Sequence, residues 1–279
     1  MPSTARRRSR SRPVRAADRR HAILARVADE QTIRVGELAS DLGCSEMTIR
    51  RDIRRLERDG FIRQTYGGAT AHITRSFDIS FNARGLLAAR EKRLIGMRAA
   101  GLIEGARLLF VGIGSTTEQF ARYLPARNDL LIVTPSLPIA SLLGTRPVGV
   151  VALGGAVLRD ELTCVGPIAT ATLAHYRFDA AVIGSAGISA RWGITELTEE
   201  EAAVQRAAVE RTDRVILIAD GSKVGAVTPI VVGSARQVTS LVTDPSAPPR
   251  ELDELRGLGI EVLVAERAAP ARLEPALGR

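Results

Sequence analysis

Five arginines lie within residues 46–58, spaced so that a helix would carry most of them on one face. At 100° per residue, Ile49, Ile53 and Leu56 fall together on the opposite face, which would pack against the protein. The polar face would carry Met47, Arg51, Arg54 and Arg58, with Arg50 and Arg55 on its flanks. Guanidinium groups bind phosphates and pair bidentately with guanine. The spacing therefore predicts a recognition helix for the major groove of DNA.

The residues of this helix divide by the part of DNA that they are expected to contact. Arg50 and Arg51 are the candidates for base edges, because the N-terminal residues of a recognition helix reach the bases. Ser45, Met47 and Thr48 could contact bases or phosphates, and Arg54, Arg55 and Arg58 are expected to contact the DNA backbone. From the predicted wing, Arg63 and Tyr66 would reach a neighbouring groove or phosphate. The alternative is a solvated arginine face. Asp52 lies beside the apolar stripe, so we expect it to be a structural partner of nearby arginines.

Residues 19–72 are predicted to form three helices and a hairpin that position this face. Two apolar stripes at helical spacing precede it: Ile23, Leu24 and Val27, then Val35, Leu38, Ala39 and Leu42. Gly43 is expected to end the second helix, Ser45 to cap the third, and Gly60 to end the third. Residues 61–69 predict a strand, a glycine turn and a return strand. Three helices followed by such a wing are typical of a winged helix-turn-helix.

The net charge of +8 is confined to the same part of the chain. Residues 1–75 hold 17 arginines, no lysine and 9 acidic residues, whereas residues 76–279 hold 22 basic and 22 acidic residues. Clustered positive charge indicates a phosphate-backbone partner. Residues 1–18 have too little apolar content to fold alone, and we interpret them as a disordered basic arm with non-specific DNA affinity. An inert extension is the alternative.

The composition limits the remaining possibilities. No apolar run reaches transmembrane length, and no signal-peptide core follows the N-terminal arginines. The two cysteines, Cys44 and Cys164, are too few for a disulfide framework or a metal cluster, and Cys44 is expected to be a packed residue. We therefore expect a cytoplasmic, nucleoid-associated protein with no cofactor, no metal and no membrane partner.

After a linker expected at residues 73–90, residues 91–265 alternate apolar runs with stretches of helix length. The runs are 108–113, 130–134, 148–153, 180–184, 215–219, 238–243 and 260–265. Such alternation predicts a mostly parallel sheet with helices on its faces, a Rossmann-like α/β domain. Residues 266–279 are rich in Pro, Ala and Arg and are expected to be a flexible tail.

Four turns rich in glycine, serine and threonine follow these runs, at residues 111–117, 134–138, 184–188 and 220–225. Ligands of open α/β sheets bind outside the carboxyl ends of the strands, so the turns can converge on one pocket. Hydroxyls and helix N-termini suit a phosphate, although helix capping explains any single turn equally well. The expected ligand-binding residues are Gly114, Ser115, Thr116, Thr117, Ser136, Gly184, Gly187, Asp220, Ser222 and Lys223.

The N-terminal segment from Arg20 to Ala69 resembles the DNA-binding domain of the deoxyribose-operon repressor (DeoR) family of bacterial regulators. The matching residues are Ile23, residues 35–39, Leu42, Ser45, residues 48–53, Leu56, Gly60 and residues 67–69. Tyr66 stands where the family often has His, which affects only the wing contact.

The C-terminal region is similar to the sensor domain of the same family. The matching segments are residues 114–117, 136–138, 154–155, 178–179, 183–184, 187–188, 193–195, 201–202 and 220–225. The resemblance implies a domain similar to ribose-5-phosphate isomerase that senses a phosphorylated sugar without converting it, and it adds Glu201 to the ligand-binding residues. It also implies repression that the ligand relieves, and assembly into dimers or tetramers.

Three residues of the sensor region depart from the family pattern. Gly112 replaces an Asp that could accept a sugar hydroxyl, and Gln205 replaces a Lys that could neutralise a phosphate. Pro135 replaces a polar Asn. These departures leave open an unusual ligand or a degraded pocket.

Three functions remain to be compared. The first is a ligand-controlled repressor that binds double-stranded operator DNA, and the second is a constitutive DNA-binding protein whose second domain only oligomerises. The third, a sugar-phosphate isomerase, requires a positioned base. His21 and His72 lie in the DNA-binding region and His175 is expected at a helix end, while Glu201 and Asp220 are as easily structural. We therefore predict a regulator and no catalytic residues.

Overall fold

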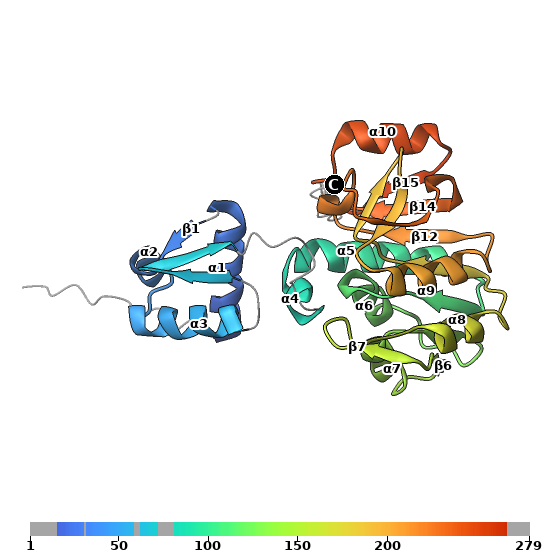
Figure 1. The fold of residues 1–279 in the computed structure, drawn as a ribbon, viewed down its shortest axis with the longest axis horizontal. Coiled ribbons are helices and arrows are strands. Elements are labelled where there is room, and N and C mark those ends of the chain that lie inside the picture. Colours follow the sequence, from blue (N-terminus) through green and yellow to red (C-terminus); the bar gives the residue numbers. More distant parts are fainter. Residues whose placement is uncertain (1–15, 31, 59–61, 72–80, 267–279) are drawn as a thin grey trace, which may run out of the picture. The chain divides into compact units, whose positions relative to one another are not determined.

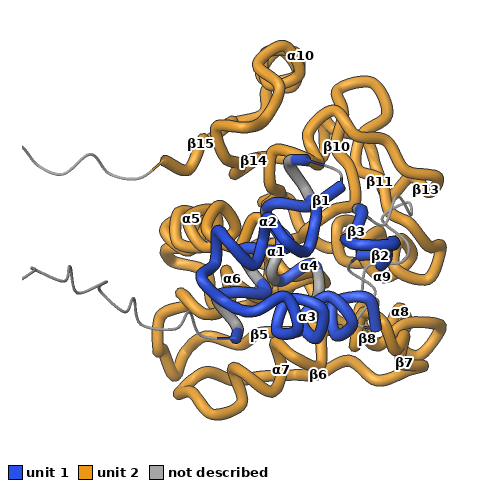
Figure 2. Tube along the Cα trace, turned by 90° about the vertical axis from the view of Figure 1, so that its left-hand side faces the viewer, with its two compact units in different colours: residues 1–87 blue, residues 88–279 orange. Residues whose placement is uncertain are grey.

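The computed structural model describes residues 16–30, 32–58, 62–71 and 81–266. It divides into two compact units, residues 1–87 and 88–279, which Figure 2 distinguishes by colour. Each unit is described by itself. Within the described residues, every helix is too short or too polar to cross a membrane.

The first unit holds the predicted helices around a small antiparallel sheet (Figure 1). Its elements are α1 (Ala16–Glu30), β1 (Thr32–Arg34), α2 (Val35–Asp41), α3 (Glu46–Arg58), β2 (Ile62–Thr65), β3 (Gly68–Ala71) and α4 (Phe81–Leu86). The apolar stripes of the three helices meet in one core, where Ile23, Ile49 and Ile53 are fully buried. The strand order is β1-β3-β2. The sequence analysis missed β1, because three residues are too short for a period-2 pattern.

The turn between α2 and α3 follows the prediction. Gly43 has a φ of 60°, its N–H donates to the Ser40 carbonyl, and the Cys44 N–H donates to the Ala39 carbonyl. This pair of bonds closes α2 in the left-handed glycine motif common at helix ends. Cys44 packs against the core as expected. The Ser45 Oγ accepts from the Thr48 N–H at 3.3 Å, so Ser45 does cap α3.

Part of the prediction for this unit lies outside the described residues, and the expected linker is partly helical. Gly60, expected to end the third helix, and Phe61, the first residue of the expected wing, lie outside the described residues. Residues 73–90, expected as a linker, contain the helix α4, and α5 already begins at Ala89. The wing itself is present as β2 and β3, joined by a turn at Tyr66 and Gly67.

The second unit is built on seven parallel strands in the order β15-β14-β12-β9-β4-β5-β6. These strands are β4 (Leu108–Val111), β5 (Leu131–Thr134), β6 (Gly149–Ala152), β9 (Ala180–Ile183), β12 (Val215–Ile218), β14 (Val238–Thr243) and β15 (Glu261–Val264). Each falls within one of the seven apolar runs, so the predicted parallel α/β domain is confirmed. The inner strands β4, β5, β9, β12 and β14 are mostly buried on both faces, which is why their sequences are largely apolar, whereas the edge strands β6 and β15 are partly exposed.

Six helices cover the two faces of this sheet. They are α5 (Ala89–Ala100), α6 (Ser115–Arg122), α7 (Leu137–Leu143), α8 (Pro167–Leu173), α9 (Glu199–Val209) and α10 (Pro249–Gly257). Helices α5, α6 and α7 pack on the face that carries Leu109 and Val182. Helices α8, α9 and α10 pack on the face that carries Phe110 and Ile183. Alternate residues of each strand therefore serve opposite layers.

Short antiparallel strands interrupt the parallel pattern. The hairpin β7 (Ala156–Leu158) and β8 (Thr163–Val165) follows β6, and β10 (Gly187–Ser189), β11 (Gly193–Glu196) and β13 (Ile230–Gly233) form a separate sheet. The sequence analysis did not predict them, because strands of three or four residues carry no clear alternation. They matter because two expected ligand-binding segments, around Gly187 and Glu201, adjoin this second sheet.

A close helix contact gives a stability prediction. A Cβ at Gly96 of α5 would lie 2.7 Å from the Phe120 backbone N of α6, whereas a Cβ at Gly257 of α10 would meet nothing within 4 Å. We expect Gly96→Ala to lower the free energy of unfolding by about 1–3 kcal/mol, despite the better helix propensity of alanine. The matched control Gly257→Ala should leave it unchanged or raise it by up to about 1 kcal/mol. Urea denaturation followed by circular dichroism measures both, and equal midpoints would contradict the packing.

A carboxylate at the start of β9 gives a pH prediction. Asp179 Oδ2 accepts from the N–H groups of Arg107 at 2.7 Å and Leu108 at 2.9 Å, and these bonds lower the pKa of the carboxyl from 3.8. The stabilisation is complete above the unfolded pKa and is lost as the pH falls through the lower folded pKa. At pH 7, Asp179→Asn should lower the free energy of unfolding by only about 1 kcal/mol, because solvent screens the exposed Asp179 carboxylate. The difference from the wild type should vanish in acid. Asp213→Asn, in an exposed ion pair with Arg177, is the control for urea titrations across pH.

Candidate DNA interface and ligand site

The helix α3 separates an apolar and a basic face as the sequence predicted. The side chains of Ile49, Ile53 and Leu56 are at most 1% exposed. On the other face Met47 is 69% exposed, and Arg51, Arg54 and Arg58 are exposed. A methionine so exposed on a short helix contributes little to the fold. Apolar side chains of this kind can contact thymine methyl groups.

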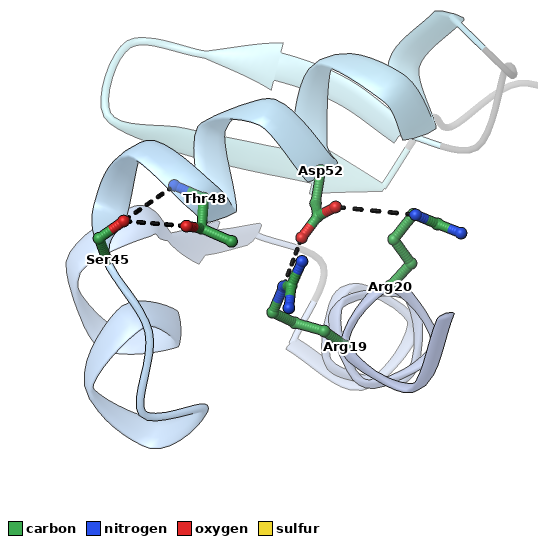
Figure 3. A network of polar contacts seen from close by, with 5 residues as sticks. All are labelled: Arg19, Arg20, Ser45, Thr48 and Asp52. Atoms are coloured by element: carbon green, nitrogen blue, oxygen red, sulfur yellow. Dashed lines mark hydrogen bonds and ion pairs between the residues drawn. The ribbon is translucent and has the colours of Figure 1, made fainter. Parts of the chain in front are cut away.

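Asp52 joins α3 to α1 (Figure 3). It is 6% exposed, and its carboxylate lies 2.5 Å from Arg19 Nε and 3.8 Å from Arg20 Nη1. This pairing confirms the expected structural role of Asp52. Two charge-assisted contacts from one helix hold the other at a fixed rotation, because a buried carboxylate without its partners is costly. In this orientation of α3, Arg51, Arg54 and Arg58 are exposed.

The arginines of α3 differ in how far other residues restrain them. Arg50 lies 3.4 Å from Glu46, one turn earlier, and Arg54 Nε donates to the Arg50 carbonyl at 3.3 Å. Arg51 and Arg58 contact no polar group among the described residues. A side chain without an internal partner can reach a base or phosphate with no bond to break, so the geometry favours Arg51 over Arg50 for base contact.

The wing is attached to the C-terminal half of α3. The Gln64 backbone N–H donates to Glu57 Oε1 at 2.8 Å, a contact that the sequence analysis missed. Arg63 on β2 and Tyr66 at the turn are both exposed, in keeping with their expected DNA contacts. Glu57 thus holds the first wing strand beside the helix that carries the basic face.

In the second unit, the strand order reverses between β4 and β9. From this point the chain runs outward through β5 and β6 on one side, and through β12, β14 and β15 on the other. Ligands of open α/β sheets bind beside such a reversal, at the carboxyl ends of the strands. The turns after β4 and β9 therefore flank the favoured position for a ligand.

The turn after β4 opens the helix α6. Ser115, Thr116 and Thr117 form its first turn, and Gly114 before them provides no side-chain cap. The Thr117 hydroxyl donates to the Gly114 carbonyl at 2.7 Å, which fixes the turn. The hydroxyls of Ser115 and Thr116 have no partner among the described residues. Two hydroxyls and uncapped backbone N–H groups together suit an anion.

Contacts around Gly184 show that three turns converge. A Cβ at Gly184 would lie 3.0 Å from the Ile113 carbonyl oxygen, 3.7 Å from Thr117 Cγ2 and 4.0 Å from the Ile218 carbonyl oxygen. The ends of β4, β9 and β12 therefore meet at this glycine. The neighbouring Ser185 carries a buried hydroxyl with no partner in the described structure, an additional polar group that the sequence analysis did not select.

The turn after β12 is organised by two aspartates. Asp220 Oδ1 accepts from the Ser222 N–H at 3.1 Å and also from its hydroxyl, and Asp244 Oδ2 accepts from the Gly221 N–H at 2.6 Å. The ammonium of Lys223 has no ionic partner among the described residues. Gly225 donates to the Ile188 carbonyl at 2.7 Å, so this turn lies beside the segment that contains Gly187.

Lys92 is the clearest residue that the sequence analysis missed. It lies on α5, is 5% exposed, and its Nζ is 3.8 Å from Asp220 Oδ2. A nearly buried lysine requires an acidic partner. No motif marked it, because it stands alone within an ordinary helical pattern at residues 89–100.

Two other predicted ligand residues have structural partners. The Ser136 Oγ accepts from the Ile139 N–H at 3.4 Å and caps α7. The Thr198 hydroxyl accepts from the Glu201 N–H at 3.3 Å and donates to the Glu201 carboxylate at 2.8 Å, which caps α9. Capping therefore accounts for part of the polar pattern, as the sequence analysis allowed.

Two of the three departures from the family pattern, Gly112 and Gln205, have local explanations, whereas the backbone contact of Pro135 is open to any residue. A Cβ at Gly112 would lie 3.3 Å from Ile183 Cγ2, so a larger residue would crowd β9. Gln205 is fully buried and donates to Glu196 Oε1 at 2.6 Å, while its own Oε1 has no partner in the described structure. The Pro135 carbonyl accepts from the Cys164 N–H at 2.8 Å and joins this turn to β8.

Comparison with known proteins covers both units. Residues 19–75 match the DeoR-like helix-turn-helix domain, and residues 87–245 match the DeoR C-terminal sensor domain. The chain is 31% identical over 248 residues to the HTH-type transcriptional repressor CsqR of Escherichia coli, covering 88% of this chain and 95% of that protein.

A second relative and one solved structure extend the comparison. The HTH-type transcriptional regulator GlpR of Haloferax volcanii is 29% identical, covering 88% of this chain and 97% of that protein. Ribose-5-phosphate isomerase A from Methanocaldococcus jannaschii aligns with 49% of this chain and 54% of that chain, at 15% identity and a TM-score of 0.36. That last similarity is too low to bear on activity.

The matches run through both units in one order and over most of the chain. This protein belongs to the DeoR family of DNA-binding transcriptional regulators.

Proposed function

We propose that this protein is a cytoplasmic repressor of sugar or carbon metabolism genes. A phosphorylated sugar would bind to it and release it from operator DNA. The observation that carries the proposal is the meeting of the β4, β9 and β12 turns at Gly184, next to the first turn of α6. Among the described residues, the hydroxyls of Ser115 and Thr116 have no hydrogen-bond partner, and Lys223, in the turn after β12, has no ionic partner. CsqR of Escherichia coli and GlcR of Bacillus subtilis are among the relatives named as transcriptional repressors.

The proposed ligand class follows from the charges at these turns. Ser115, Thr116 and the first N–H groups of α6 would bind phosphate oxygens, and Lys223 would supply positive charge. Asp220 accepts hydrogen bonds within its own turn, and it lies beside Lys92. Glu201 and Ser136 each take part in a helix cap. They would bind sugar hydroxyls through the oxygen lone pairs or hydroxyl hydrogen that the cap does not use.

For DNA binding we expect Arg51→Ala and Arg58→Ala to differ in kind. Arg51→Ala should weaken binding to a preferred sequence by about 1–3 kcal/mol and relax the base preference, because a bidentate pair with guanine is lost. Arg58→Ala should weaken binding to all sequences alike and reduce the salt slope by about 1, because only a phosphate contact is lost.

Fluorescence anisotropy with duplexes selected from a random pool, and with their scrambled versions, separates these effects. Arg177→Ala is the control, because Arg177 is an exposed arginine of the second unit, with a side chain 78% exposed. Equal losses on selected and scrambled DNA for Arg51→Ala would show that Arg51 contacts only phosphate.

For the ligand we expect a thermal-shift screen of the full chain to identify a phosphorylated sugar. A ligand at about 100 times its dissociation constant stabilises the folded state by roughly 2.7 kcal/mol, a shift of several degrees. Lys223→Gln should weaken binding of the phosphorylated compound and leave its unphosphorylated counterpart unaffected. The same compound should release DNA in the anisotropy assay. Hits from unphosphorylated compounds alone would refute the ligand class.

The second candidate is a constitutive DNA-binding regulator whose α/β unit only oligomerises. The hydrogen bond between Gln205 and Glu196 favours it, because a neutral amide occupies the position of an expected phosphate counter-charge. This candidate predicts that no sugar phosphate changes DNA affinity or thermal stability.

A further inference from the structure

Four apolar side chains are exposed around the β7–β8 hairpin. Leu137 is 37%, Val157 47%, Leu162 36% and Ile168 64% exposed. We call these four residues the hairpin patch. They come from the hairpin itself and from the first residues of α7 and α8, and Figure 1 shows β7 near α7 and β6.

Backbone contacts bring the members of the hairpin patch together. Ser136 forms an antiparallel bridge with Thr163, and the Leu137 N–H donates to the Leu162 carbonyl at 3.0 Å. Val157 lies on the neighbouring strand, opposite Cys164. At the start of the hairpin, a Cβ at Gly154 would lie 3.4 Å from Ile168 Cγ2. The patch is therefore one local surface and not four scattered residues.

Leu162 has an unfavourable backbone conformation. Leu162 has a φ of 50°, in the left-handed region that favours glycine or asparagine. Strained backbone persists mainly where function requires it. Leu162 nevertheless leaves 36% of its surface exposed within its own chain. A contact that covers the side chain would account for it.

The charges at the hairpin tip indicate what covers the patch. Arg159 and Asp160 are exposed neighbours, and neither has an ion-pair partner among the described residues. In a two-fold pairing of identical surfaces, Arg159 of one copy can meet Asp160 of the other, twice. The edge strand β6, half-exposed in its middle and exposed at both ends, directly precedes the hairpin in the chain.

We propose that the hairpin patch and the charged tip form the two-fold surface through which two copies of this chain pair. The proposal rests on the function proposed above, since helix-turn-helix proteins bind paired half-sites as dimers. A stable interface buries roughly 800 Å² on each partner, more than four side chains supply, so the tip and β6 would complete it.

Sedimentation velocity of the full-length chain over a range of concentrations tests the patch. Leu162→Asn fits the left-handed backbone, and Val157→Thr keeps the side-chain shape, so both variants should fold. Each substitution occurs twice in a two-fold interface, and we expect each to raise the dimer dissociation constant at least about tenfold. The control Val231→Thr makes the same change at a residue of β13 that is 46% exposed, and should have no effect.

Charge reversal tests the tip. Arg159→Asp and Asp160→Arg should each weaken self-association, and an equimolar mixture of the two variants should associate as well as the wild type, because every contact again joins opposite charges. A mixture that remains dissociated, unchanged association of Leu162→Asn and Val157→Thr, or a monomeric wild type would each overturn the proposal. DNA and ligand binding are measured separately by anisotropy and thermal shift, so failure of this surface is distinguishable from failure of the proposed function.

Discussion

The close approach of β4 and β9 is the constraint on which the proposed ligand site depends. Neighbouring parallel strands lie about 4.8 Å apart, so residues that follow them are forced into contact. Gly112 and Gly184 stand at this approach, where a Cβ would crowd Ile183 and the Ile113 carbonyl oxygen respectively. The turn that carries Ser115 and Thr116 is thereby set against the turn that carries Ser185. The polar groups of the site are close because the sheet order reverses here.

A comparable constraint acts in the first unit through Asp52. Its buried carboxylate, paired with Arg19 and Arg20, fixes the rotation of α3 about its axis. The same rotation buries Ile49 and Ile53 and exposes Arg51 and Arg58. In both units, one short-range interaction decides which side chains remain available to a ligand or to DNA.

The departures from the family pattern gain a physical meaning from the structure. Gly112 leaves room for Ile183, and Gln205 directs its amide to Glu196. Gly112 thus serves packing, while Gln205 satisfies its amide nitrogen and leaves its buried amide oxygen without a partner in the described structure. Lys92, beside Asp220, supplies a positive charge near the turn after β12 that the sequence analysis had not considered. Loss of one expected lysine therefore does not leave this end of the sheet without a cation.

The sequence by itself determined the elements and the chemistry of the DNA-binding face. Helical spacing placed Ile49, Ile53 and Leu56 opposite the arginines, and the seven apolar runs located every strand of the parallel sheet, because both patterns are local and periodic. Only the tertiary structure decided which turns meet, that Lys92 lies beside Asp220, and that Leu137, Val157 and Leu162 share a surface. Those facts depend on strand order and on hairpins too short to leave a periodic signal, so no local pattern could encode them.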